Sequence, residues 1–478
     1  MIFALLLSCL HFASCITMKT ASGARLSLPA LNKLYNKGTR PSLVRIPEDK
    51  WRIEAKRHSE RLQFLLGPGL TSADDQLNTG LRRNPAARKG DSWTALDPKN
   101  PIYNFLIEYY GLKGAKGPRR LARWSPNFDL LNLDESLLVD KGVTTLQDEK
   151  SACLREIDDA VMEASQGLGG IFLENATEDD LGGSLHLRGA VPVLSSSQNM
   201  YGVLYNPAIF YKRNEPIETP EQRQLRLKTL SPFQWYSSIL RTTLDSEPIL
   251  HCHGLHEWAM QYHPPGAPPP PSAKYQSSIP LRVSREVINE AVERRGISCT
   301  HVDALRFFAP AAGPLNHHGS ELQRTDQLRL EQKGCVHAHM DLLKIALKIQ
   351  PFIDATLMGD ILEVALKSRL LDVEASPYDA TAFGAEVVAV ETSAGRKVYR
   401  TRQKQLMNEA EPIRIRLLEA YETFINLAFP EEILLNRSDE NHVKRDDVYI
   451  APERFAKAEP GGLPWRKNLI EEPQSSHN

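Results

Sequence analysis

Apolar residues between 51 and 428 recur mainly at three- and four-residue spacings, and this periodicity constrains the chain to a largely helical fold. In 101–112, for example, Ile102, Phe105, Leu106 and Tyr109 follow the helical repeat. Comparable patterns predict helices over 51–66, 101–112, 221–243, 284–295, 321–332, 337–349, 355–371 and 411–428. We therefore expect a single large globular domain that is mainly α-helical.

A minor β element accompanies these helices. Short runs of β-branched and other apolar residues predict strands at 169–173, 190–194, 201–205, 385–392 and 397–400. The last two runs are separated by 393–396, a short polar segment with a glycine, and we expect them to pair as a hairpin.

The 478-residue chain divides into a presequence, a domain and a tail. Residues 1–17 have the apolar run and small residues of a secretory signal, and 18–47 have the basic, acid-free composition of a transit peptide. Together they predict a bipartite address to a plastid, with secretion as the alternative. The catalytic domain is predicted over 48–430, with a proline-rich surface insertion at 264–272, and a polar tail occupies 459–478.

The domain is acidic once the presequence is set aside. Residues 1–47 hold six basic residues and no acid, which leaves 52 basic and 59 acidic residues in the rest of the chain. Because nucleic-acid affinity depends on Lys and Arg neutralising phosphates, nucleic acid is a weaker candidate partner than a small-molecule substrate. No apolar stretch of about 20 residues follows the N-terminus, so we expect no transmembrane span. The oligomeric state is left open.

Histidine is concentrated in one part of the chain. Nine of the 14 histidines lie between His251 and His339, about a fifth of the sequence. Six of the nine fall in three short segments, HCHGLHEW at 251–258, CTHVDALRFF at 299–308 and GCVHAHMD at 334–341. Imidazole and carboxylate groups carry protons near neutral pH or bind metal ions. An active site is therefore predicted within 251–341.

Four residues of these segments are candidate ligands for a divalent metal ion, iron or zinc: His256, His301, His337 and Asp341. His337 and Asp341 are four positions apart on a predicted helix and therefore share a face. Two histidines and one carboxylate with open positions are typical of non-haem iron, and the same ligand types bind zinc.

Four further residues are candidate catalytic groups: Glu257, Asp303, Arg306 and Tyr378. Glu257 or Asp303 could act as a general base, Arg306 could bind an anionic group, and Tyr378 could project into a cleft from the turn at 375–379. The last three have a structural alternative. Asp303 is suited to cap a helix over 304–309, Arg306 to pair with an acid, and Tyr378 to shape a turn.

The motifs GLHEWAM at 254–260, HVDALRFF at 301–308, GCVHAHMDL at 334–342 and ASPYD at 375–379 resemble a bacterial and algal family whose members are described as 3-methyladenine DNA glycosylases. The resemblance extends over about 51–428. His256, Glu257, His301, Asp303, Arg306, His337 and Asp341 occupy the family's motif positions. The resemblance implies hydrolysis of an N-glycosidic bond and an aromatic pocket for a flipped base, for which Trp258, Tyr262, Phe307 and Phe308 are candidates.

Three hypotheses follow from these observations. The first is a metal-dependent enzyme, either a hydrolase or a non-haem oxygenase, that acts on a small molecule. The second is a metal-free N-glycosidic hydrolase, as the resemblance implies. The third is a non-catalytic protein that binds a small molecule.

Overall fold

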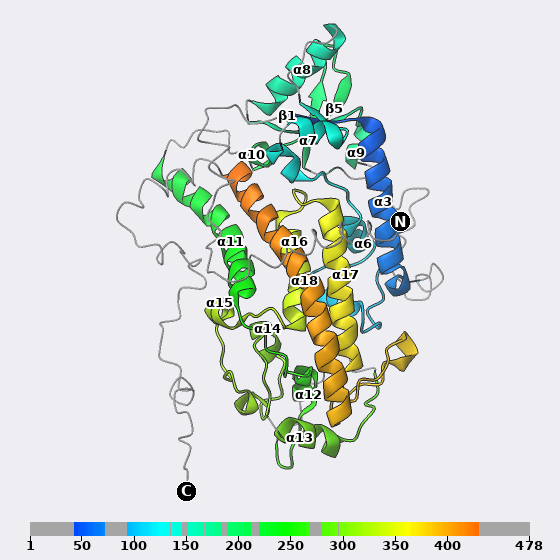
Figure 1. Cartoon of the computed structure of the whole chain (residues 1–478), viewed down its shortest axis with the longest axis vertical. Helices are drawn as coiled ribbons and strands as arrows, with labels where there is room; N and C mark the ends of the chain where they lie inside the picture. The colour runs from blue at the N-terminus through cyan, green and yellow to red at the C-terminus, as the bar shows by residue number, and fades with distance from the viewer. Residues whose placement is uncertain are drawn as a thin grey trace, which may run out of the picture. The chain divides into compact units, whose positions relative to one another are not determined.

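This computed structural model describes residues 43–429, except 72–92, 134, 146–151, 167, 183–186, 188, 212–218, 268–278 and 295. The predicted fold, mainly helical with a minor β element, is confirmed (Figure 1). The predicted signal segment 1–17, most of the transit segment 18–47, part of the insertion and the tail 459–478 lie outside the described residues.

A group of packed helices forms the body of the domain. In Figure 1, α16 (Val336–Ile349), α17 (Ala355–Glu374) and α18 (Ser393–Ala428) lie side by side, and α11 (Pro220–Asp245) packs along α18. On its other side α17 packs against α3 (Glu48–Leu66). The helix α17 is therefore buried on most sides. No described helix is both long and apolar enough to span a membrane.

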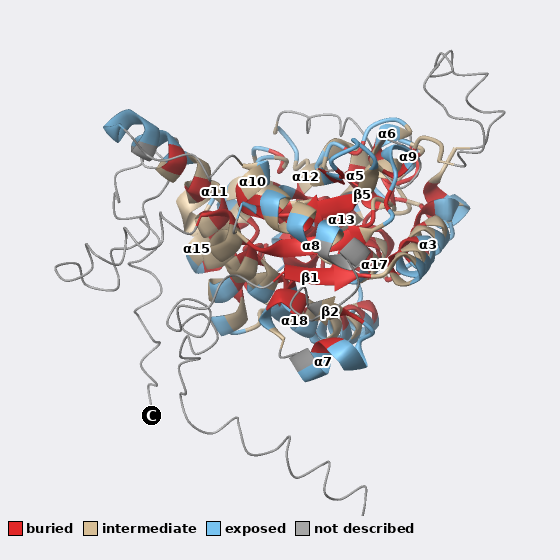
Figure 2. Ribbon diagram, turned by 90° about the horizontal axis from the view of Figure 1, so that it is seen from above, coloured by how far each residue is buried: buried red, intermediate tan, exposed pale blue. Residues whose placement is uncertain are grey.

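A five-stranded sheet is the second part of the fold. Its order is β2-β1-β3-β5-β4, with β1 parallel to β3 and the other pairs antiparallel. The strands are β1 Leu43–Ile46, β2 Thr144–Thr145, β3 Gly170–Glu174, β4 Ala190–Leu194 and β5 Met200–Tyr205. One face packs against α8 (Ala152–Ser165) and the other joins the main core, so β1 and β5 are buried (Figure 2).

A smaller apolar core lies around α12 (Leu255–Gln261), α13 (Arg285–Glu293) and α14 (Val302–Leu305). Trp258 and Phe308 belong to this core, together with Tyr262. The remaining elements are short: η1 Gly67–Gly69, α5 Asn104–Glu108, α6 Lys116–Leu121, η2 Phe128–Asn132, α7 Glu135–Asp140, α9 Glu178–Gly182, α10 Pro207–Phe210, η3 Gly313–Leu315, η4 Arg324–Asp326, α15 Gln327–Leu330 and η5 Thr381–Phe383, where η is a 3₁₀ helix.

The predicted hairpin over 385–400 is wrong. The segment expected to turn between its strands is the first turn of α18. The Thr392 hydroxyl caps this helix by accepting a hydrogen bond from the Gly395 amide at 3.0 Å. Val388 and Val390, which gave the appearance of a strand, are buried in the smaller core without pairing as a strand. Tertiary burial here outweighs the β propensity of valine.

Two predicted helices are also shorter than expected. The periodic segment 101–112 contains only α5, and 321–332 is divided into η4 and α15. Asp303 does not cap a helix over 304–309. His301 is the residue before α14, and Asp303 lies inside that helix with its carboxylate bound to other side chains.

Candidate functional site

A cavity of about 230 Å³ lies between α5, α12, α14, α16 and α17. Six of the eight predicted site residues line it: Glu257, His301, Asp303, Arg306, His337 and Asp341. His256 lies behind His337, with ring centres 4.3 Å apart, and Tyr378 does not line the cavity.

His256, His337 and Asp372 form one candidate metal-binding group at the inner wall of the cavity. The Nε2 atom of His256 and the Oδ1 atom of Asp372 are 2.8 Å apart. The two atoms are buried and form an ion pair when His256 is protonated, and neither has a further hydrogen-bond partner among the described residues. A divalent ion bound between this imidazole and this carboxylate would take the place of the proton that they share. Only His337 of the three lines the cavity.

Arg369 orients the carboxylates around this group. Its Nη1 atom donates to Oδ2 of Asp372 at 2.5 Å and to Oε1 of Glu257 at 3.1 Å. Its Nε atom donates to the backbone oxygen of Pro101 at 2.9 Å. Although burial opposes ionisation, His256 and Arg369 hold the pKa of Asp372 well below its usual range. Arg369 therefore leaves Oδ1 of Asp372 directed at His256.

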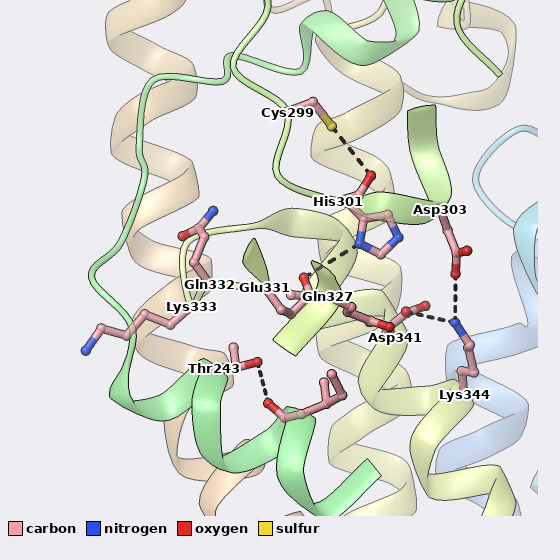
Figure 3. Close-up of polar contacts among 12 residues, drawn as sticks. Thr243, Cys299, His301, Asp303, Gln327, Glu331, Gln332, Lys333, Asp341 and Lys344 are labelled. Atoms are coloured by element: carbon pink, nitrogen blue, oxygen red, sulfur yellow. Dashed lines mark hydrogen bonds and ion pairs between the residues drawn. The ribbon is translucent and has the colours of Figure 1, made fainter. Parts of the chain in front are cut away.

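Asp303 and Asp341, the other carboxylates of the cavity, already share a cation. Figure 3 shows the Lys344 ammonium between them, 3.1 Å from Oδ2 of Asp303 and 3.0 Å from Oδ2 of Asp341. Arg324 also binds Asp303, at 3.0 Å. Burial opposes ionisation of Asp303, but Lys344 and Arg324 hold its pKa well below the usual range. His301, Asp303 and Asp341 are close enough to bind a metal, yet Lys344 supplies the positive charge there.

His301 joins the two halves of the site. Its ring stacks on that of His337, with centres 4.8 Å apart and planes within 12°. Its Nδ1 atom faces Oε1 of Glu331 at 3.6 Å, on the side away from Asp303 (Figure 3). Cys335 is close to the same pair, but burial raises the pKa of its thiol well above the ordinary value. Without a metal this thiol is neutral and a poor ligand.

Aromatic side chains form the outer wall of the cavity. Tyr109 and Phe307 contact each other edge to face with ring centres 5.8 Å apart, and Arg306 lies 4.7 Å from the Phe307 ring centre. The Tyr110 hydroxyl donates to Oδ1 of Asp341 at 3.3 Å. Of the four aromatic residues suggested for a flipped base, only Phe307 lines the cavity.

Tyr378 lies outside the cavity wall. It is buried, and its hydroxyl accepts a hydrogen bond from Nε2 of Gln261 at 2.9 Å. The turn that precedes it is bound to α12, because Nε1 of Trp258 donates to the backbone oxygen of Ala375 at 2.8 Å. Tyr378 therefore helps to join the turn to α12, and its catalytic role stays a prediction.

The four predicted ligands do not form one group. His256 and His337 belong with Asp372, whereas His301 and Asp341 belong with Asp303. The sequence prediction lacked Asp372 and its partner Arg369, although Arg369 lies in the helix predicted over 355–371 and Asp372 directly follows that range.

The resemblance to the 3-methyladenine DNA glycosylases stays a prediction. Comparison with protein-family models, with curated proteins and with solved structures finds no match for this chain.

Proposed function

We propose that this chain is a metal-dependent enzyme that acts on a small molecule in the 230 Å³ cavity, with His256, His337 and Asp372 as the metal ligands. The observation that carries the proposal is the 2.8 Å contact between Nε2 of His256 and Oδ1 of Asp372, two buried atoms that have no further hydrogen-bond partner among the described residues. Two ligand atoms bound at about 2.0–2.1 Å to one ion, at angles of about 90–110°, lie roughly 2.9–3.4 Å apart. The observed 2.8 Å is close to that separation.

Two histidines and one carboxylate leave coordination positions open for substrate or water. A divalent ion so bound can polarise a carbonyl or phosphoryl oxygen, activate water, or, as iron, support oxygen chemistry. Arg369 fixes the carboxylate ligand from behind, which is the usual role of an outer partner of a metal ligand.

The cavity provides the remaining functions. Glu257 lines it within reach of the metal-binding group and is held by Arg369, so it is placed to accept a proton from a bound molecule. Tyr109 and Phe307 offer apolar faces for a flat group of the substrate. Arg306 is exposed at the rim and can bind an anionic substituent.

The metal content of the purified full-length chain, measured by elemental mass spectrometry, tests this proposal. We expect about one equivalent of iron or zinc in the parent and a loss of at least 10-fold in metal affinity in His337→Gln and Asp372→Asn. His263→Gln is the matched control, because His263 lies outside the three candidate metal-binding groups. Circular dichroism identifies variants that fail to fold.

The metal that is found separates the two chemistries. Iron would favour an oxygenase and zinc a hydrolase. If the folded parent and control bind neither metal after reconstitution, the metal-dependent enzyme is ruled out. A metal-free hydrolase with Glu257 as the base, in agreement with the glycosylase resemblance, would then be the better hypothesis.

A further inference from the structure

A second cavity, of about 270 Å³, collects histidines that the metal-binding group does not use. Its polar lining consists of imidazole, guanidinium and hydroxyl groups: His251, His253, Arg294, Ser298, His317, Arg396 and Arg400. No Asp or Glu is among the described residues that line it. Leu255, Ala291 and Val390 add an apolar wall. The cavity is therefore strongly biased towards positive charge.

Local structure brings these groups together from separate parts of the chain. Arg396 and Arg400 are four positions apart on α18 and share a face. Arg294 ends α13 and is followed by Gly296, whose φ of +68° is a conformation that favours glycine. A Cβ atom on Gly296 would lie 2.9 Å from Nε2 of His317, so glycine is required for the His317 ring to approach.

Two acids close to the cavity, Glu391 and Glu290, are paired with arginines, and one of these arginines, Arg294, is itself a lining residue. The Glu391 carboxylate accepts two hydrogen bonds from Arg282, at 2.7 and 2.9 Å, and its backbone oxygen accepts from Arg294 and Arg396. Arg396 also donates from Nη1 to the backbone oxygen of Val390 at 2.9 Å and from Nη2 to the Ser393 hydroxyl at 3.2 Å. Glu290 pairs with Arg294 on the exposed side of α13. Arg400 is exposed and has no ion pair with any described residue.

His318 follows the lining residue His317 and is close to His251. Burial lowers the pKa of His318, and the nearby His317 and His251 lower it further. A metal does not account for this arrangement, because the ligand atoms of His251, His253 and His317 do not form a metal-binding group among the described residues. An anion with several acceptor oxygens fits the donors better.

We propose that this cavity binds the phosphate group of a small phosphomonoester, held by Arg396, Arg400 and the surrounding histidines. Guanidinium groups match phosphate oxygens in charge and in geometry. The cavity volume of about 270 Å³ exceeds what a phosphate ion fills, and the apolar wall takes the organic part of the ester. The site is separate from the candidate metal-binding group, since His256, His337 and Asp372 are not among the residues that line this cavity.

Isothermal titration calorimetry on the full-length chain in phosphate-free buffer tests this site, with phenyl phosphate, inorganic phosphate and phenol as probes. We expect phenyl phosphate to bind more tightly than inorganic phosphate, and phenol not to bind. Arg400→Gln should weaken phenyl phosphate binding by roughly 10- to 100-fold, because it removes a charge-assisted contact. Lys404→Gln, one turn further along α18 and outside the cavity lining, changes the net charge equally and should leave binding within about 2-fold.

Equal weakening in Arg400→Gln and Lys404→Gln would show general charge attraction and overturn the site. The absence of binding by either phosphate probe to the folded parent would do the same. If inorganic phosphate binds as tightly as phenyl phosphate, the assignment of a phosphomonoester is wrong and the ligand is the free phosphate ion. His337→Gln should leave phosphate binding unchanged, so failure of the metal proposal and failure of this one are distinguishable.

Discussion

Starting the chain at Glu48 instead of Ser42 should remove a strand that the sheet needs. The segment predicted as transit peptide ends at residue 47, yet β1 occupies Leu43–Ile46 inside it. This strand pairs with β2 on one side and β3 on the other. A presequence that ended at residue 47 would include an interior strand of the folded domain.

The structure gives the size of the effect. Leu43, Val44 and Ile46 are 8%, 0% and 2% exposed, and burial of each such side chain contributes about 1.5–3 kcal/mol. Their loss therefore amounts to roughly 4–9 kcal/mol, before the ladder hydrogen bonds are counted. Arg45 also pairs with Asp158 and Glu174. The free energy of unfolding of a domain is about 5–15 kcal/mol, so the loss of β1 could remove most of it.

Urea denaturation of chains that begin at Ser42 and at Glu48, followed by far-ultraviolet circular dichroism, measures this difference. We expect the longer chain to unfold cooperatively and the shorter one to be unfolded or to have lost most of its free energy of unfolding. In the full-length chain, Val44→Ala should cost about 2 kcal/mol, whereas Ile53→Ala at a half-exposed position of α3 should cost less than about 0.5. Equal stability of the two truncated chains would refute the role given to β1.

Two other stability predictions concern buried charge. Lys344→Met removes the cation between Asp303 and Asp341 and should lower the free energy of unfolding at pH 7 by about 1–3 kcal/mol. This loss is smaller than for a fully buried ion pair, because the Lys344 side chain is 21% exposed. Lys348→Met on the same helix is the control, expected within about 0.5 kcal/mol in urea denaturation. Burial lowers the pKa of His58 in the native state. Below pH 6.5 the unfolded state therefore takes up a proton that the native state does not. The free energy of unfolding then falls by at most about 1.4 kcal/mol per pH unit as the pH is lowered. Urea denaturation at pH 7, 6 and 5 should show a shallower decline in His58→Gln, and an unchanged slope would contradict this assignment.

The fold was predictable where one helical face is apolar over several turns. The segments 51–66, 221–243 and 355–371 fall within α3, α11 and α17, and the strands at 169–173, 190–194 and 201–205 correspond to β3, β4 and β5. The failures are short segments in which the same residues suit two structures. Val388 and Val390 are buried irregular chain, and a polar tetrapeptide that resembles a hairpin turn is also a good helix start.

The position of His337 and Asp341 on one helix followed from their spacing, but their assignment to one metal did not. Helical spacing predicts which side chains share a face of the helix. It does not predict which Lys or Arg side chains, from the same helix or from another segment, contact that face. Lys344, one turn after Asp341, supplies that charge and separates Asp341 from the metal-binding group. The polar residues of α16 therefore include both a candidate metal ligand, His337, and a counter-ion, Lys344.

The sequence nevertheless contained a signal for Asp372 and Arg369. On α17, Thr356, Asp360, Glu363 and Lys367 follow one another at spacings of four, three and four, and these positions form the stripe nearest to solvent. At about 100° per residue, Arg369 lies roughly 200° around the helix from Lys367, on the opposite side. A charged residue opposite the polar stripe of an otherwise apolar helix must be paired inside the protein. Asp372, one turn later, is its nearest partner in sequence and also the residue that completes the candidate metal site.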